Sequence, residues 1–204
     1  MKFEDWEPIY QEIIEYFGFD REEDERAAKL LSDLLPGDDI ILLEEACLGH
    51  DICVCGNAPC LKNEISLVKG TVFAADAASL VLLAHGIRPD AIFTDLDGAT
   101  DEFVTMNNDG TIVVVHAHGD NMPLLRHWVP RFTGPIVGTT QSRPLPHVHN
   151  FGGFTDGDRA IFAAHALGAA SITILGFDLE DSRVDHMKRG KLLWAKKLLS
   201  LLEP

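Results

Sequence analysis

The stretch from Ala91 to Gly98 reads A-I-F-T-D-L-D-G, a short apolar run that passes at once into an acidic turn. Similar runs recur along the chain, and most are continuously apolar instead of alternating with polar residues. Continuous runs are typical of strands covered on both faces, as in a parallel sheet with crossover helices. The predicted strands are Ile52–Cys55, Thr71–Ala74, Ala91–Thr94, Ile112–Val115, Pro135–Gly138 and Ser171–Leu175. The sequence therefore predicts an α/β fold with a doubly wound, mostly parallel, Rossmann-like sheet.

Helical stretches separate these runs, and a further helical segment precedes them. The helices expected between and after the strands are Pro59–Leu67, Asp76–His85, Met122–Phe132, Thr155–Leu167 and about Val184–Leu202. Before the first strand, apolar residues such as Trp6, Ile9 and Ile13 recur at helical spacing, and Pro36 with Gly37 ends this region. We therefore divide the chain into an N-terminal helical segment, residues 1–36, and an α/β catalytic domain, residues 37–204.

The charge of the chain limits its partners. Seventeen basic residues stand against 32 acidic ones, a formal net charge of −15. This charge repels phosphate backbones, so no nucleic-acid partner is expected, although phosphate can bind locally beside a metal ion or a few basic side chains. The sequence contains no apolar run long enough to span a membrane and no signal-peptide pattern at its start. We expect a cytoplasmic protein with no membrane partner.

Four cysteines lie between Cys47 and Cys60, and they include no C-x-x-C pair. Cys53 and Cys55 are expected on one face of a strand, because they are two residues apart. We interpret the four as reduced thiols. A zinc cluster is the alternative, but it lacks the paired spacing that is usual for zinc sites.

Acidic residues follow two of the predicted strands. Asp95 and Asp97 come directly after one strand, and Asp76 follows the preceding one. Because the carboxyl ends of parallel strands share an edge of the sheet, these side chains are expected to meet around one ligand. Neighbouring carboxylates repel each other unless a divalent cation joins them, and Mg²⁺ prefers carboxylate oxygens and bridges to phosphates. We predict all three as magnesium ligands; the alternatives are a D-x-D-G turn and a helix N-cap at Asp76.

A glycine-rich loop, Phe151–Arg159, leads into a predicted helix. Its two glycines let backbone N–H groups approach an anion, and a helix N-terminus attracts phosphate. Its two aspartates repel phosphate unless a metal ion intervenes, so we link this loop to the same cation. The alternative is an ordinary capped helix, because Thr155 and Asp158 have the spacing of a capping box. The loop residues expected to bind substrate are Gly152, Gly153, Asp156, Asp158 and Arg159.

The segment His116–Asp120, H-A-H-G-D, resembles the opening of the binuclear metal motif of metallo-β-lactamase-like hydrolases, in which imidazoles hold zinc. That motif ends in histidine where this chain has Asn121, and the surrounding pattern does not match the sandwich fold of those hydrolases. We favour hydrogen-bonded loop histidines, with Asp120 and Asn121 near the ligand.

The loop Gly56–Pro59 follows the first predicted strand and opens a helix at Pro59, a favoured first helical position. It lacks the full G-x-G-x-x-G dinucleotide fingerprint, and no P-loop pattern occurs in the chain. We expect Gly56 and Asn57 to seat a nucleotide phosphate or ribose.

Together these motifs resemble those of archaeal 6-hydroxymethyl-7,8-dihydropterin diphosphokinases, which are distant relatives of thiamin diphosphokinase. The resemblance covers about residues 52–178. The motifs that carry it, in chain order, are Ala74–Asp76, Gly86–Asp90, Thr94–Gly98, His116–Asn121, Thr139–Gln141 and Phe151–Arg159.

The resemblance implies Mg²⁺-dependent transfer of diphosphate from ATP to the hydroxyl group of the pterin, with release of AMP, in pterin cofactor biosynthesis. It implies catalytic roles for Asp95, Asp97 and Asp120, with Asp76 assisting at the metal. Phe151 or Phe154 is expected to form an apolar wall for the ring. The residues implied to bind nucleotide or pterin are Gly56, Asn57, Asn121, Thr140, Gln141, Gly152, Gly153, Asp156, Asp158 and Arg159.

Two other functions stay open at this point. A D-x-D motif at a strand end also binds metal and diphosphate in nucleotide-sugar glycosyltransferases, so the motif alone does not separate the two classes. A non-catalytic nucleotide-binding module is the third interpretation, and it predicts binding of ATP and Mg²⁺ without release of AMP. A homodimer formed through the helical N-terminus is also left open.

Overall fold

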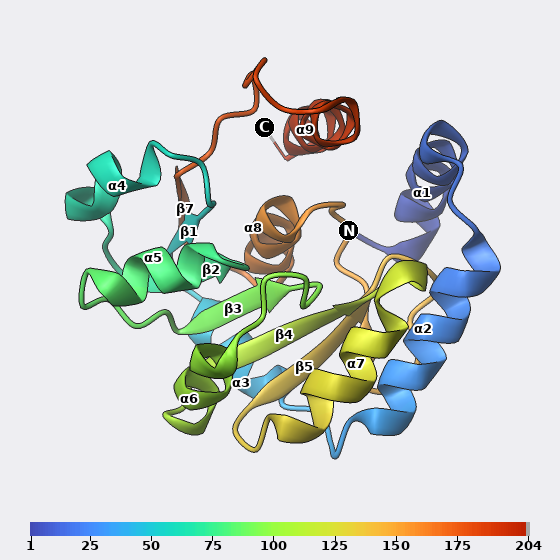
Figure 1. Cartoon of the computed structure of the whole chain (residues 1–204), viewed down its shortest axis with the longest axis horizontal. Helices are drawn as coiled ribbons and strands as arrows, with labels where there is room; N and C mark the ends of the chain where they lie inside the picture. Colours follow the sequence, from blue (N-terminus) through green and yellow to red (C-terminus); the bar gives the residue numbers. More distant parts are fainter. Residues whose placement is uncertain (203–204) are drawn as a thin grey trace.

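The computed structural model describes residues 1–202, so the last two residues of the predicted α/β domain, 203–204, lie outside the described residues. Seven strands of the described part form one sheet in the order β6-β5-β4-β3-β2-β1-β7, and every neighbouring pair is parallel (Figure 1). The strands are β1 (Asp51–Cys55), β2 (Thr71–Ala75), β3 (Ala91–Thr94), β4 (Ile112–Ala117), β5 (Ile136–Thr140), β6 (Val148–His149) and β7 (Ser171–Leu175). All six predicted strands are present, and the predicted doubly wound α/β fold is confirmed.

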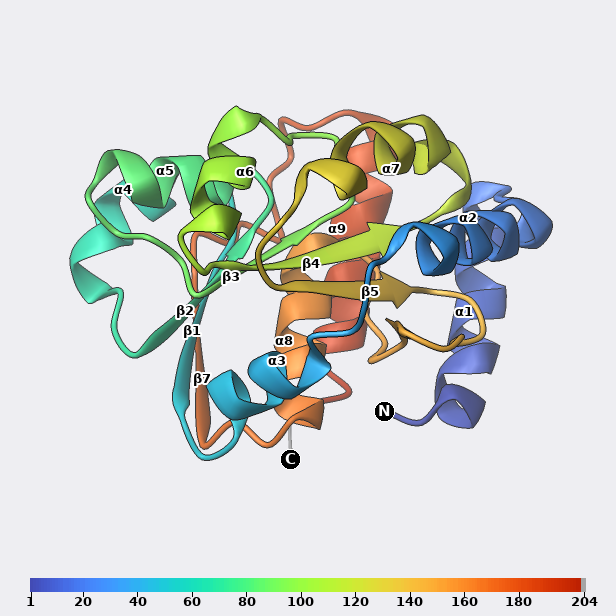
Figure 2. The same cartoon turned by 90° about the horizontal axis from the view of Figure 1, so that it is seen from below.

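Helices cover both faces of this sheet. The α-helices are α1 (Phe3–Phe17), α2 (Arg21–Leu34), α3 (Ile40–Cys47), α4 (Leu61–Glu64), α5 (Ala78–Ala84), α6 (Asp101–Asn108), α7 (Met122–Trp128), α8 (Asp156–Ala166) and α9 (His186–Leu199). Short 3₁₀ turns are η1 (Ile65–Leu67), η2 (Gly119–Asn121) and η3 (Val129–Arg131). Figure 2 shows α6 and α7 on one side of the strands and α3 and α8 on the other.

The two-sided cover explains the continuous apolar runs. In β4, Val113 and Val115 pack with residues of α2, α6 and α7. Ile112 and Val114 point to the opposite face and pack with α3 and α8. Because side chains alternate across a strand, a strand buried on both faces must be apolar at every position.

Helices α1 and α2 are tied to the edge of the sheet. Trp6 Nε1 donates to the backbone oxygen of Gln141 at 2.8 Å, and the Tyr10 hydroxyl donates to Asp24 Oδ2 at 2.7 Å. Asp24 also accepts from the N–H of Gly119 and from Gln141 Nε2. The N-terminal helices are therefore part of the same core, and a boundary at residue 36 stays a prediction.

Three elements were not predicted from the sequence: α3, α6 and β6. The first turn of α3, Ile40–Leu43, is four consecutive apolar residues and so shows no helical periodicity. Helix α6 ends in two asparagines and contains β-branched residues, which are weak helix formers. Strand β6 has two residues, too few for a pattern.

Some predicted helices start or end elsewhere. Helix α5 begins at Ala78 and not at Asp76, because Asp76 adopts a left-handed backbone conformation with φ of 46°. Asp76 is therefore not its N-cap. The regions predicted as Pro59–Leu67 and Met122–Phe132 each divide into a short α-helix and a 3₁₀ turn.

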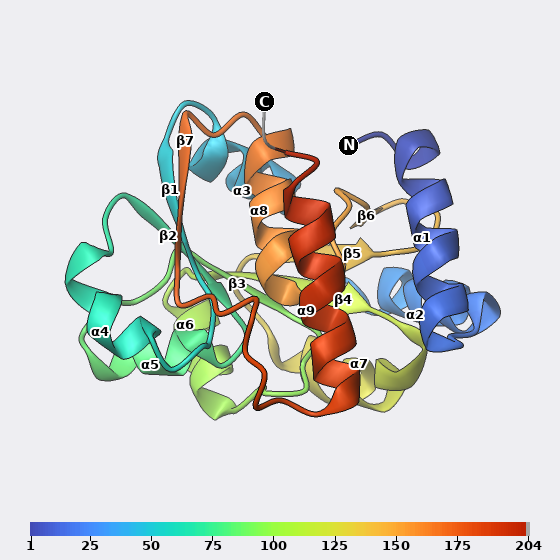
Figure 3. The same cartoon turned by 90° about the horizontal axis from the view of Figure 1, so that it is seen from above.

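Helix α9 runs alongside α8, at the carboxyl end of the sheet (Figure 3). Its Trp194 and Leu198 are buried in a cluster with Trp6, Tyr10 and Phe154. This packing fixes one face of α9 and turns a second face toward the strand-end loops. Among residues 1–202, no helix combines the length and the apolar character needed to cross a membrane.

Candidate active site

A cavity of about 700 Å³ opens at the carboxyl ends of the strands. The loops that follow β1, β2, β3, β4, β5 and β7 contribute to its wall, together with the α1–α2 link, the start of α8 and one face of α9. The strand-end loops thus meet at one edge, as expected for a parallel sheet. The predicted site residues that line the cavity are Gly56, Asn57, Asp76, Asp95, Asp97, Asp120, Gln141, Asp156 and Arg159.

Three carboxylates meet at the floor of this cavity. One oxygen atom from each of Asp76, Asp95 and Asp156 lies within 4.8 Å of the other two. This spacing fits a hard cation such as Mg²⁺, which binds carboxylate oxygens and keeps other positions for water or phosphate. No other group of His, Cys, Asp or Glu side chains in residues 1–202 has such ligand spacing. The alternatives of a zinc pair at the histidines or a cysteine zinc cluster therefore gain no support from the described residues.

The backbone around this floor is held in unusual conformations. Asp76 and Leu96 have φ values of 46° and 74°, a region that residues other than glycine rarely adopt. Thr94 Oγ1 donates to Asp76 Oδ1 at 2.6 Å and accepts from the N–H of Leu96 at 2.8 Å. A Cβ atom on Gly98 would overlap Asp76 Oδ2. The T-D-L-D-G turn therefore needs glycine at its end, because the carboxylate from the neighbouring strand occupies that space.

The electrostatics of the floor favour a bound cation. Burial raises the pKa of Asp156 well above its usual range, and the charges of Asp95 and Asp76 add to the shift, although Arg159 opposes it. Burial also raises the pKa of Asp76. For Asp95 burial acts upward too, but the side chain of His118 and the charge of Arg159 outweigh it and hold the pKa at about 2. Crowded carboxylates of this kind are stabilised by an added positive charge.

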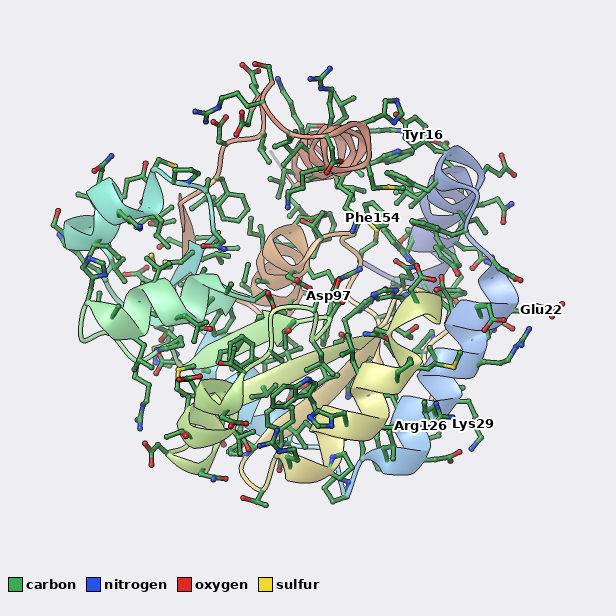
Figure 4. All side chains as sticks on the ribbon, viewed as in Figure 1. Tyr16, Glu22, Lys29, Asp97, Arg126 and Phe154 are labelled. Carbon is green, nitrogen blue, oxygen red and sulfur yellow. The ribbon has the colours of Figure 1, made fainter. Side chains whose placement is uncertain are left out.

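Asp97 does not join the cluster, although the sequence placed it there. Its backbone N–H donates to Asp95 Oδ1 at 3.1 Å, and the left-handed Leu96 turns the two side chains apart. Asp97 is exposed and lines the cavity at its rim. Figure 4 shows it near the centre of the molecule, whereas Glu22 and Lys29 lie on the outer side of α2. The third carboxylate of the cluster is that of Asp156, which the sequence placed among the substrate-binding residues.

A model of the family described as 6-hydroxymethylpterin diphosphokinase MptE-like matches residues 26–184. The chain belongs to this family. Three relatives, each named 6-hydroxymethyl-7,8-dihydropterin pyrophosphokinase, align with all of this chain. They are proteins of Pyrococcus furiosus (43% identical, 95% of that protein covered), Methanothermobacter thermautotrophicus (39%, 96%) and Methanocaldococcus jannaschii (33%, 96%). The resemblance inferred from the ordered motifs is confirmed.

Part of the glycine-rich loop of this MptE-like chain lines the cavity, and three of its predicted site residues support the floor from outside. Gly152, Gly153 and Asp158 do not line the cavity. Gly153 has φ of 87°, and a Cβ atom there would lie 2.7 Å from the backbone nitrogen of Arg159. Asp158 is buried and forms the capping box with Thr155 that the spacing predicts. These residues fix the start of α8, which carries the third carboxylate.

Two other motif residues of the family member also hold loops instead of lining the cavity. Asn121 Nδ2 donates to the backbone oxygens of Asp95 and His116 at 2.8 and 2.7 Å, so it joins the turns after β3 and β4. Thr140 Oγ1 lies 3.0 Å from Ser142 Oγ within the loop after β5. Sequence motifs alone do not distinguish such positioning residues from residues that touch a ligand.

Parts of the cavity wall in this MptE-like chain were missed by sequence reasoning. Phe19 comes from the α1–α2 link, Asp24 from α2, and Phe177 follows β7. The Phe177 ring lies where a Cβ atom on Gly56 or Gly157 would approach it to 2.9 or 2.7 Å. Phe177 follows a strand, so its position at the carboxyl edge of the sheet could have indicated that it lines the site. Phe19 carried no such signal, because it lies in an acidic helical region far from the motifs in sequence.

Proposed function

We propose that this chain transfers diphosphate from ATP to the hydroxyl group of 6-hydroxymethyl-7,8-dihydropterin in a Mg²⁺-dependent reaction that releases AMP. The observation that carries the proposal is the meeting of Asp76, Asp95 and Asp156 on the floor of a 700 Å³ cavity. Three crowded carboxylates suit a metal-bound polyphosphate, because the cation cancels their repulsion and bridges to phosphate oxygens. The names of the relatives support the choice of a pterin as acceptor.

The sheet order separates two parts of the cavity. Gly56 and Asn57 line it beside β1, and the floor carboxylates Asp76 and Asp95 follow β2 and β3. Beyond the floor, Phe19 and Phe154 form an aromatic wall with ring centroids 6.4 Å apart. A flat pterin ring suits the aromatic wall, and a nucleotide suits the open glycine loop. We therefore assign the pterin to the aromatic side and the nucleoside to the β1 side, with the polyphosphate between them.

The proposed reaction joins the hydroxyl oxygen of the pterin to the β-phosphorus of ATP. The bond between the β-phosphorus and the oxygen bridging to the α-phosphate breaks, and AMP leaves with that oxygen. The bound cation supplies charge neutralisation along the polyphosphate. Such transfer depends on alignment and on charge stabilisation more than on covalent help from the protein.

The residues of the chain then have separate tasks. Asp76, Asp95 and Asp156 would hold the cation through their carboxylate oxygens. The guanidinium group of Arg159, which lies 3.2 Å from Asp156 Oδ1, orients that carboxylate and adds positive charge to the floor. Asp120 also lines the cavity, and in this proposal its carboxylate accepts the hydroxyl proton.

The test is an incubation with Mg²⁺, ATP and the pterin alcohol, in which the nucleotide product is identified by chromatography. We expect AMP and the pterin diphosphate in equal amounts, and no product when a chelator removes Mg²⁺. Excess Mg²⁺ added back should restore the reaction. Release of ADP would indicate transfer of a single phosphoryl group and would overturn the proposal, as would binding of ATP without any AMP.

A further inference from the structure

The lysines of helix α9 fall into two groups. Lys188 and Lys191 lie on the face that lines the cavity. Lys196 and Lys197 lie on the outer side and form ion pairs with surface carboxylates at 2.6 and 2.7 Å. The same helix therefore carries two paired lysines directed away from the site and two others directed into it.

The two inner lysines have no ion-pair partner in the described part of the chain. No carboxylate of residues 1–202 lies within 4 Å of the ammonium group of Lys188 or Lys191. This is notable in a chain with 32 acidic residues. Asp181, which also lines this part of the cavity, is paired with Arg183 at 2.9 Å. The inner lysines are thus available to a ligand.

The inner lysines face the carboxylate floor across the open cavity. Lys188 and Lys191 are three residues apart, so they lie on one side of the helix. Both lysines line the same cavity as Asp76, Asp95 and Asp156. The buried side chains Trp194 and Leu198 anchor α9 in this orientation. Positive side chains and the floor therefore enclose one space from two sides.

We propose that Lys188 and Lys191 bind the β- and γ-phosphate oxygens of the nucleotide and hold the transferred diphosphoryl group between α9 and the carboxylate floor. Ammonium groups bind phosphate as compact point charges, and their long stems can follow the group as it moves from ATP to the acceptor. The site would bind ATP and inorganic pyrophosphate through these lysines, but it would bind AMP without them. This inference rests on the proposed function, because it names the residues that hold the group transferred.

The test compares binding of three probes, ATP, AMP and inorganic pyrophosphate, to the full chain in the presence of Mg²⁺ by titration calorimetry. In the double variant Lys188→Met with Lys191→Met, we expect the affinities for ATP and pyrophosphate to fall by about a hundredfold. The affinity for AMP should stay within about twofold of wild type. Each single variant should lose about tenfold for ATP, so the inference can be tested even if the double variant does not fold.

The matched control is the double variant Lys196→Met with Lys197→Met. It lies on the same helix and also removes two positive charges, so both double variants have a formal net charge of −15 − 2 = −17. The control should bind ATP and pyrophosphate as wild type does. Equal losses in the inner and outer variants would show a general effect of net charge and would overturn the inference.

Failure of this inference can be told from failure of the proposed function. If wild-type protein releases AMP but the inner variants bind ATP and pyrophosphate normally, the lysine assignment falls and the proposed reaction stands. If wild-type protein releases no AMP, the proposed reaction falls. Loss of pyrophosphate binding in the inner variants alone would then still support a diphosphate site under α9.

Discussion

The floor and the helical cover of the cavity are built in opposite ways. The floor carries three half-buried carboxylates, Asp76 and Asp95 on strand-end turns and Asp156 at the start of α8, and the two turns contain the left-handed residues Asp76 and Leu96. The cover, α9, presents two lysines on long side chains from a regular helix. The floor is positioned by backbone geometry, and the cover by the packing of Trp194 and Leu198.

This difference predicts how each region responds to change. A substitution in the floor acts on atoms held by several short contacts, so it should have large and local effects. A substitution in α9 acts through flexible side chains or through the buried packing of the helix, so its effects on activity should be smaller. The following predictions test this contrast.

The largest effect is expected for Asp156→Asn. Loss of a ligand to the cation should lower kcat/KM by about a thousandfold, the result of losing about 4 kcal/mol of transition-state stabilisation. Because Asp156 has a raised pKa, its ionised form destabilises the metal-free fold at neutral pH, and the neutral amide should raise the melting temperature of chelator-treated protein. Steady-state kinetics and calorimetry measure the two quantities. The control is Asp109→Asn, at an exposed position. If metal-free Asp156→Asn melts at a lower temperature than metal-free wild type, the crowded carboxylates do not destabilise the fold, contrary to this prediction.

An intermediate effect is expected for Gly98→Ala. Its Cβ atom would overlap Asp76 Oδ2 and displace that carboxylate from the cluster. A displacement of about 1 Å at a reacting centre can lower the rate by about a hundredfold, and we expect a loss of that order in kcat. The control is Gly37→Ala, where a Cβ atom meets nothing within 4 Å. Equal kcat values for the two variants would show that the turn tolerates movement of Asp76.

The smallest effect on activity is expected for Leu198→Ala, which removes part of the buried packing that holds α9 in place. The side chain is fully buried, so unfolding free energy should fall by about 3 kcal/mol. The loosened helix should raise KM for ATP about threefold, equivalent to about 0.6 kcal/mol in binding, while kcat stays close to wild type. Urea unfolding and initial rates test this. The control is Leu193→Ala, on the exposed side of α9, which should change neither the unfolding free energy nor KM. A large loss of kcat in Leu198→Ala would show that the packing of α9 also positions the floor carboxylates.

The sheet was predictable because its signal is local. Ala91–Phe93 and Ile112–Val115 are apolar at every position, and both runs lie within strands. The capping box at Thr155 and Asp158 was likewise readable, because its partners are three residues apart. Helix α3 was missed because Ile40–Leu43 lacks periodicity, and only its packing against the sheet makes it a helix.

The membership of the carboxylate cluster was less predictable. Asp95 and Asp97 are neighbours in sequence, yet the left-handed Leu96 sends one to the floor and the other to the rim. Asp156 enters the floor from α8, 61 positions after Asp95 in the chain, a pairing that follows from the placement of α8 against the sheet. Motif spacing shows only which residues are near each other in sequence. The geometry of a carboxylate cluster depends on distances in space, and the packing of loops and helices sets those distances.

Local pattern was enough to define the parallel α/β architecture, the edge at which its loops meet and the family to which the chain belongs, because apolar runs, capping and strand-end motifs involve residues close together in the chain. Packing settled which aspartates share the floor, which motif residues merely brace the loops, and how Phe19 and the lysines of α9 reach the cavity from the two ends of the chain. Those contacts join residues separated by most of the sequence, so they exist only once the sheet, α1 and α9 have come together.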